Sequence, residues 1–298
     1  MDALITIVLD GLQYSSYLFI VSAGLTITFG VMKILNVCHS SFFAWGAYTA
    51  AFFIGQFSEM GWPDAFGFVI IGLSAIVVGL VLGLLVERGL LRYMYERDEV
   101  LIVLATFGAF LVLEDVILLV FGVNPYFAYQ PMALLDSVEI GGITRDVYGL
   151  SLILVSSIVA VVCWYGLNRT KWGDILKAVI NDREMSVAMG INVTMVYIVT
   201  FVGGAMLGAL GGAYIAPTVS VTPGFGIDVI VLSFAVVVIG GMGSIPGALI
   251  GSVLIGLLRA FTVHEFPQIE LFVVFAVMAI VLVFRPEGLF APPKQRKI

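Results

Sequence analysis

The chain alternates long apolar runs with short polar stretches from one end to the other. A bilayer core about 30 Å thick is crossed by a helix of about 20 apolar residues. Only 11% of the residues are charged, against roughly 25% in soluble domains. We therefore predict an all-α, polytopic transmembrane helix bundle that forms a single domain over residues 1–298. The predicted spans are 12–32, 40–57, 65–86, 100–121, 148–167, 191–213 and 270–284, with a glycine-interrupted stretch at 227–260.

This pattern gives about eight or nine membrane segments, at least one of them broken or re-entrant. Lys and Arg near the ends of spans mark the cytoplasmic side. Of the fourteen such residues, only Arg145 and Arg259 are predicted to lie in loops on the other side. We therefore expect a multi-pass protein of the cell inner (plasma) membrane, with its N-terminus outside and its C-terminus cytoplasmic. The twelve on the cytoplasmic side are Lys33, Arg88, Arg92, Arg97, Arg169, Lys171, Lys177, Arg183, Arg285, Lys294, Arg296 and Lys297.

Glycines recur at a spacing of four within several spans. Lipid tails give helices little hydrophobic reward for contact, so close approach through small residues has to bring them together. We predict packing seams at Gly79/Gly83, Gly204/Gly208, Gly208/Gly212 and Gly247/Gly251.

The run 227–260 is interrupted by Gly240, Gly241, Gly243, Pro246 and Gly247. Interrupted backbone at membrane depth survives only where protein buries it or water reaches it, and transporters place solute sites there. We predict a gating role for Gly240, Gly241 and Gly243. The sequence leaves open whether this stretch is a cytoplasmic turn or a re-entrant break. It lacks the preceding strand that a nucleotide-binding glycine motif needs.

Polar residues inside apolar runs are costly and mark candidate functional positions. Asn36, His39 and Ser40 would share one helix face if a helix started early. Either they form a helix start, with Asn36 as the cap and His39 bound to a carbonyl, or they line the transport pathway. Glu114 and Asp115 could serve a proton-coupled carrier, but a buried structural hydrogen bond is the favoured interpretation.

Ligand-type residues do not gather in a metal-binding pattern. Cys38 and Cys163 lack C-x-x-C spacing, and we interpret both as packed thiols. His264 is predicted to lie in an outer loop with Glu265 and Glu270, without metal-ligand spacing. We therefore predict no metal site.

No phosphate-binding loop occurs in the sequence, so any ATP that drives transport must be hydrolysed on another polypeptide. The predicted cytoplasmic loop 168–190 contains apolar residues at helical spacing. Such an amphipathic helix can lie on lipid or press into a groove on a partner protein. The apolar positions are Ile175, Leu176, Val179 and Ile180, followed by Val187 and Ala188.

This loop resembles the ATPase-contacting loop of ABC importer permeases, although Lys177-Ala178-Val179 stands where other importers have Glu-Ala-Ala. Further blocks extend the resemblance to the smaller permease of the branched-chain amino acid ABC importers. They are Gly24–Met32 with Asn36 and His39, Thr200–Ala205, Gly240–Ala248 and Phe284–Leu289. The residues predicted to couple to the ATPase are Asp174, Ala178, Asp182, Ala188 and Gly190.

The resemblance implies a transport subunit rather than an enzyme, within a five-part assembly in the membrane lipid. Its other parts would be a second related permease, two ATPases that bind ATP and Mg, and an extracytoplasmic solute-binding protein. It implies no cofactor on this chain and no nucleic-acid partner. The solute stays open among branched-chain amino acids, urea, short amides and aromatic or other carboxylic acids. Two other classes remain: a proton-coupled carrier that uses Glu114 or Asp115, and a channel-like subunit.

Overall fold

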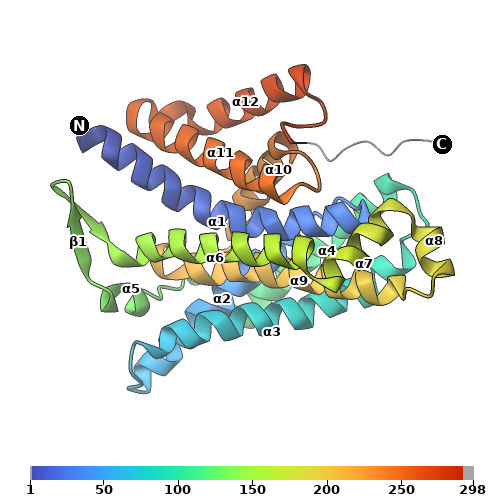
Figure 1. Ribbon diagram of the computed structural model, residues 1–298. Coiled ribbons are helices and arrows are strands. Elements are labelled where there is room, and N and C mark those ends of the chain that lie inside the picture. Colours follow the sequence, from blue (N-terminus) through green and yellow to red (C-terminus); the bar gives the residue numbers. More distant parts are fainter. Residues whose placement is uncertain (1, 291–298) are drawn as a thin grey trace.

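The computed structural model describes residues 2–290, and most of them are helical. Within this range, seven helices are long and apolar enough to cross a membrane. The shorter α10 and the less apolar α2 also run along the bundle (Figure 1). The predicted all-α transmembrane bundle is confirmed. The helices are α1 (Asp2–Met32), α2 (His39–Glu59), α3 (Phe66–Gly89), α4 (Glu99–Phe121), α6 (Val147–Arg169), α9 (Val193–Ile215), α10 (Phe225–Gly240), α11 (Ile245–Glu265) and α12 (Glu270–Phe284).

The two ends of the bundle carry different short elements (Figure 1). One end, here called the hairpin end, holds α5 (Gln130–Leu134) and the antiparallel strands β1 (Ser137–Ile140) and β2 (Ile143–Asp146). The other, the α7–α8 end, holds α7 (Lys171–Asn181) and α8 (Arg183–Ala188). The remaining short elements are the 3-10 turns η1 (Leu91–Tyr93), η2 (Ala216–Thr218) and η3 (Pro267–Ile269).

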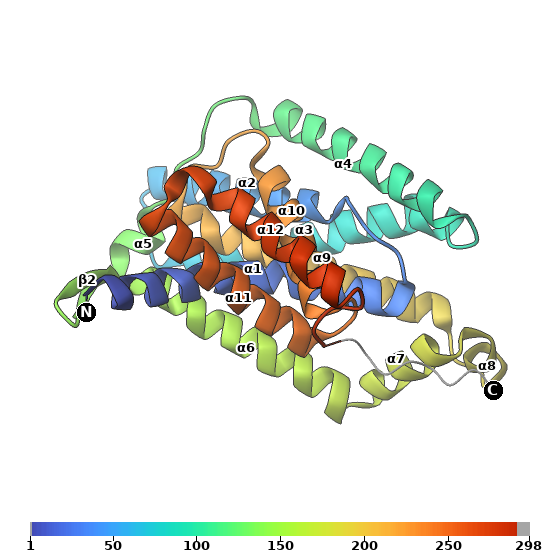
Figure 2. The ribbon, with the colours of Figure 1, turned by 90° about the horizontal axis from the view of Figure 1, so that it is seen from above.

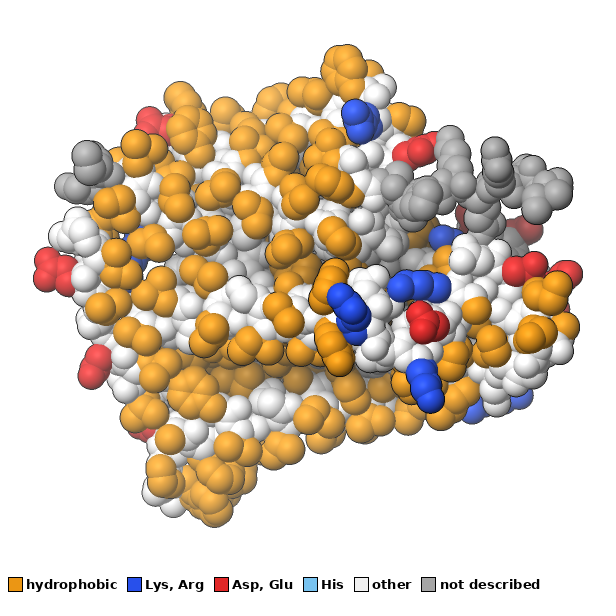
Figure 3. Space-filling view, viewed as in Figure 1, with side chains coloured by type: hydrophobic (Ala, Val, Ile, Leu, Met, Phe, Trp, Pro, Cys, Tyr) orange, Lys and Arg blue, Asp and Glu red, His pale blue; other side chains and the backbone are white. Residues whose placement is uncertain are grey.

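Helices α1 and α9 form the interior of the bundle. The apolar window of α1 is 89% buried, whereas that of α12 is only 6% buried. Figure 2 shows α4 and α6 along opposite sides of the molecule. Apolar side chains cover much of the flank between the two ends (Figure 3), as expected of a surface that faces lipid.

The predicted glycine seams are confirmed. A Cβ on Gly212 of α9 would lie 1.9 Å from the carbonyl oxygen of Phe43 on α2, and one on Gly24 of α1 would lie 2.4 Å from the carbonyl oxygen of Gly204. Any side chain there would push the helices apart. Gly79 and Gly83 meet α9 in the same way, and Gly247 and Gly251 meet α10.

The stretch 227–260 is a pair of helices joined by a turn at residues 241–244. Gly243 adopts a φ of 86° there, a conformation that glycine enters at little cost. The hydroxyl of Ser244 then caps α11 by accepting a hydrogen bond from Gly247 N at 3.1 Å. Because Gly243 packs against Gly30 near the end of α1, the turn lies at the α7–α8 end.

Broken backbone occurs instead where α2 and α10 begin. The first residue of α2, His39, contacts Val21 of α1, three helical turns or about 16 Å before α1 ends. Phe225, the first residue of α10, stacks on Phe43 of α2 with ring centroids 5.2 Å apart. Both helices therefore begin partway along the bundle, after the irregular segments 33–38 and 219–224.

Arg145 lies on β2 at the hairpin end and pairs with Asp10 at 2.5 Å. Arg259 lies within α11 and not in a loop. His264 and Glu265 end α11, and Glu270 begins α12, so the outer loop predicted to hold them is replaced by helix ends. The described basic residues that were predicted on the cytoplasmic side lie at the ends of the helices that meet at the α7–α8 end, or in the segments that join them. Lys294, Arg296 and Lys297 lie outside the described residues.

Candidate functional site

Asn36, His39 and Ser40 are all buried at the start of α2. Because α2 begins at His39, Asn36 precedes the helix, and the predicted shared helix face is not formed. The Asn36 Oδ1 accepts a hydrogen bond from Cys38 N at 3.1 Å, and Ser40 Oγ donates to Val37 O at 3.2 Å. The residues form a helix start, but Cys38 is the N-cap of α2 and no side chain caps it, so the expected cap role of Asn36 is wrong.

His39 ties this helix start to the interior. Its Nε2 lies 2.9 Å from the carbonyl oxygen of Val21, and a carbonyl only accepts, so Nε2 carries the proton. Its ring would meet a Cβ on Gly24 at 2.9 Å and one on Gly208 at 3.2 Å. Small residues on two helices therefore make room for this histidine.

Glu114 of α4 is half-buried, and a backbone hydrogen bond from Gly224 reaches its carboxylate. Gly224 is the N-cap of α10, and a helix N-terminus stabilises a negative charge. This contact agrees with the structural interpretation of Glu114. The neighbouring Asp115 is exposed on the other side of α4.

Gly240, Gly241 and Gly243 lie at the end of α10 and in the following turn. The segment after α12 holds them in place, because Leu289 N and Phe290 N donate hydrogen bonds to the carbonyl oxygens of Ile239 and Gly240 at 2.8 and 3.0 Å. The predicted gating role of these glycines stays a prediction.

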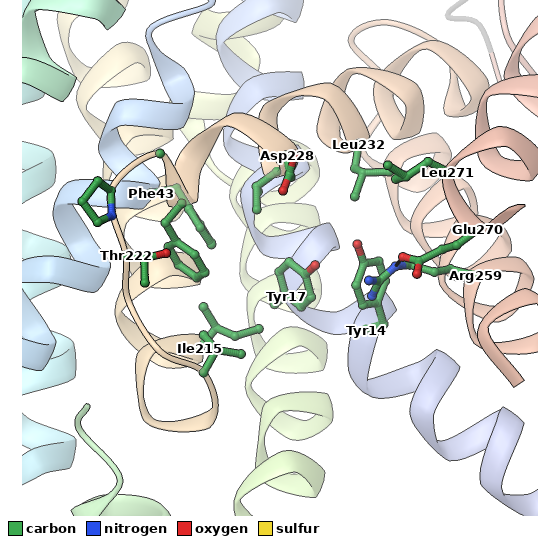
Figure 4. A pocket seen from close by; sticks show the side chains of 15 residues that line it. Tyr14, Tyr17, Phe43, Ile215, Thr222, Asp228, Leu232, Arg259, Glu270 and Leu271 are labelled. Atoms are coloured by element: carbon green, nitrogen blue, oxygen red, sulfur yellow. Dashed lines mark hydrogen bonds and ion pairs between the residues drawn. The ribbon is translucent and has the colours of Figure 1, made fainter. Parts of the chain in front are cut away.

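A hollow lies elsewhere, between α1, α2, α10 and the start of α12. This half-depth cavity has a volume of about 560 Å³ and is shown in Figure 4. Its lining residues are Tyr14, Tyr17, Phe43, Ile215, Val219, Thr222, Pro223, Gly224, Phe225, Asp228, Val229, Leu232, Arg259, Glu270 and Leu271.

The charged groups of the cavity lie around two tyrosines (Figure 4). Arg259 forms a salt bridge with Glu270, and its guanidinium lies 3.8 Å above the ring centroid of Tyr14. Asp228 projects from the first turn of α10, and among the described residues no basic side chain pairs with it. The sequence interpretation missed this group, although an acidic residue at the start of the run 227–260 was a usable signal.

Helices α7 and α8 fill the predicted coupling loop 168–190. The stripe Ile175, Leu176, Val179 and Ile180 packs against its own protein, where α7 contacts α1, α6 and α9. It is therefore unavailable to lipid or to a partner, and the expectation that this stripe would do the docking is wrong.

The opposite surface of this region is exposed. Ala178 and Asp174 lie on the open side of α7, and Ala188 on α8 is exposed as well. Asp182 caps α8, because its carboxylate accepts a hydrogen bond from Met185 N at 2.9 Å. Gly190 ends the helix with a φ of 84°. Three large apolar side chains around α8 are open, namely Met185 at 59%, Val187 at 58% and Met189 at 75% exposed.

The bundle, its helices that begin partway along its length, and its exposed α7–α8 end are features expected of a permease. The sequence profile of the family described as "Branched-chain amino acid transport system / permease component" matches residues 7–282. The chain belongs to this family. It is a permease subunit of the branched-chain amino acid transport type, and the family implies that its transport is driven by ATP.

Relatives align over nearly the whole chain. The high-affinity branched-chain amino acid transport system permease protein BraD of Pseudomonas aeruginosa is 26% identical, with 97% of this chain and 96% of BraD covered. LivH of Escherichia coli K12, of the same description, is 23% identical over the same shares. The fructose import permease protein FrcC of Rhizobium meliloti is 36% identical, over 35% of this chain and 31% of FrcC.

Among solved structures, PsaBC from Streptococcus pneumoniae in complex with Fab superposes with a TM-score of 0.47 at 14% identity. The superposition covers 95% of this chain and 91% of that chain.

Proposed function

We propose that this chain pairs with a second, related permease to form the pathway of an ABC importer for a branched-chain amino acid or a similar small solute. Two partner ATPases would bind ATP and Mg and dock on the α7–α8 end. An extracytoplasmic solute-binding protein would deliver the solute to the hairpin end. The relatives that align over the whole chain support the branched-chain amino acid as solute.

The exposed apolar surface around α8 is the observation that carries this proposal. Because the inner stripe of α7 fixes the helix to the bundle, a force applied to the outer surface is transmitted to α1 and α9. Exposed methionine and valine side chains beside charged neighbours are suited to a groove on a protein partner. The ATPase would contact Asp174, Ala178 and Ala188. The roles of Asp182 and Gly190 would be structural, because they begin and end α8.

The distribution of charge supports the same orientation. Lys33, Arg88, Arg169 and Lys177 all lie in or beside the segments that meet at the α7–α8 end, and basic residues mark the cytoplasmic side. In the proposed orientation, α7 and α8 would lie where the ATPases have access to ATP, the N-terminus would lie outside, and the C-terminus would be cytoplasmic.

The test uses the importer expressed with its partner subunits. Ala178→Asp puts a charge on the docking surface, and burying an unpaired charge in an interface is strongly unfavourable. We expect it to abolish ATP-driven uptake and co-purification of the ATPases while membrane insertion is kept. Ala133→Asp is the matched control for membrane insertion and for co-purification of the ATPases, because Ala133 is an exposed alanine on α5 at the opposite end.

Gly190→Pro is a second variant on the same surface. Proline holds φ near −65° and has no N–H, whereas Gly190 has a φ of 84° and donates to Val187 O at 3.0 Å. We expect the same loss of uptake. Normal uptake with normal ATPase co-purification in both variants would refute the docking proposal.

A further inference from the structure

We infer that the half-depth cavity is a solute subsite that receives the ammonium group of an amino acid at the carboxylate of Asp228. This inference rests on the proposed function, in that it assumes an amino-acid solute. It adds the residue and the charge that would recognise one within this chain.

The position of the cavity suits a transport pathway. Tyr17 is the middle residue of α1, so the cavity reaches half the depth of the bundle. Phe43 and Phe225, from the first turns of α2 and α10, stack at its wall. Helices that are interrupted at mid-depth are where transporters place their solutes.

The charge balance of the cavity favours a cation. Three lining residues carry a formal charge, namely Asp228, Glu270 and Arg259, and their net charge is −1. Arg259 and Glu270 neutralise each other in a salt bridge. Asp228 carries the remaining charge, and within the described residues no basic side chain offsets it.

The region around Asp228 also offers hydrogen-bonding groups. Tyr14 and Tyr17 are hydrogen-bonded to each other, and Tyr14 lies close enough to Asp228 to interact with its charge. Their side chains project from α1 toward α10 in Figure 4. An ammonium group has three donors, so one held at the Asp228 carboxylate keeps donors for other acceptors of the lining, which include the two tyrosine oxygens.

The rest of the lining is apolar. Phe43, Ile215, Leu232 and Leu271 face the same space. A volume of about 560 Å³ falls within the range of small-ligand pockets, roughly 300–1,000 Å³. A hydrocarbon side chain fits these walls, whereas a sugar would leave several hydroxyl groups without partners there. The lining therefore favours an amino acid with an apolar side chain.

The experiment measures binding of radiolabelled L-leucine to the purified importer without its solute-binding protein. Unlabelled competitors show whether the protein recognises the ammonium group or the carboxylate of the amino acid. 3-Methylbutylamine keeps the ammonium group and lacks the carboxylate, 4-methylpentanoate does the reverse, and D-fructose tests a sugar. We expect the amine to compete and both 4-methylpentanoate and fructose to fail.

Variants then locate the ammonium site. Asp228→Asn is expected to weaken binding of L-leucine and of the amine at least tenfold, and Asp228→Glu to restore part of it. Glu139→Gln, which removes an exposed carboxylate from the hairpin, should bind as the unaltered protein does. Unchanged thermal unfolding and ATPase co-purification of Asp228→Asn would show that the fold is intact.

The inference is overturned if L-leucine does not bind, if 4-methylpentanoate or fructose competes better than the amine, or if Asp228→Asn binds normally. The proposed function is not refuted by these results as long as ATP still drives uptake. Conversely, uptake that does not depend on ATP would refute the proposed function. If L-leucine binding still depended on Asp228 in that case, the subsite would remain supported.

Discussion

His39 at the start of α2 donates a hydrogen bond from Nε2 to the carbonyl oxygen of Val21 on α1, across 2.9 Å. This bond joins two helices in the interior of the bundle, where both side chains are fully buried. It fixes the depth at which α2 begins and, through Phe43, the wall of the half-depth cavity.

Replacing His39 with leucine removes this bond and leaves the space between Gly24 and Gly208 poorly filled. We expect a loss of about 1–2 kcal/mol in the free energy of unfolding, the scale of interhelical hydrogen bonds in membranes. Chemical unfolding in detergent measures it. The control is His264→Leu, at the other histidine of the chain, which is exposed at the end of α11. Equal losses in the two variants would contradict the role given to His39.

The seam between α9 and α2 predicts a sharp contrast between two glycines of one helix. A Cβ on Gly212 would lie 1.9 Å from Phe43 O, whereas one on Gly203 would meet nothing within 4 Å. Gly212→Ala should therefore cost about 1–3 kcal/mol of stability, and Gly203→Ala should change it by no more than about 0.5 kcal/mol. Thermal unfolding of both variants checks this. A harmless Gly212→Ala would show that the helices are not in this contact.

Tyr95, near the α7–α8 end, donates its hydroxyl to Glu87 Oε1 at 2.6 Å. The Glu87 side chain is fully buried, and burial raises the pKa of Tyr95 above its usual value, so the phenol keeps its proton. Tyr95→Phe should cost about 1–3 kcal/mol, because a buried carboxylate oxygen loses its donor.

Tyr93→Phe provides the control for that substitution. Tyr93 is 70% exposed, and it lies only two residues away along the chain. Its hydroxyl is accessible to solvent in both the folded and the unfolded protein, so Tyr93→Phe should leave the free energy of unfolding unchanged. If Tyr95→Phe proves as mild as Tyr93→Phe, the hydrogen bond from Tyr95 does not stabilise the fold, and the ion pair of Glu87 with Arg88 suffices.

The sequence predicted those features that follow from local periodicity. Apolar runs gave the spans, and the four-residue glycine spacing gave the seams at Gly204, Gly208 and Gly212. The half-depth cavity escaped prediction because Tyr14, Asp228 and Glu270 are far apart in the chain and only tertiary packing brings them together. The stripe of α7 was correctly identified as apolar, but periodicity does not say what covers a face, and here the bundle itself covers it.

Two local errors have similarly clear causes. We expected Asn36 to cap the helix of His39 or to share a face with it, but Lys33 adopts a φ of 56° and α2 begins only at His39, with Cys38 as its N-cap. Arg259 was predicted in a loop outside the spans, yet its ion pair with Glu270 and its stacking on Tyr14 allow it to lie inside α11.

The energy source tests the central claim most directly. The importer would be reconstituted in liposomes with its ATPases, and uptake of labelled L-leucine delivered by its solute-binding protein would be measured under two conditions. We predict uptake when ATP is supplied on the side of the α7–α8 end and none with a pH gradient alone. Uptake driven by the pH gradient without ATP would contradict the account.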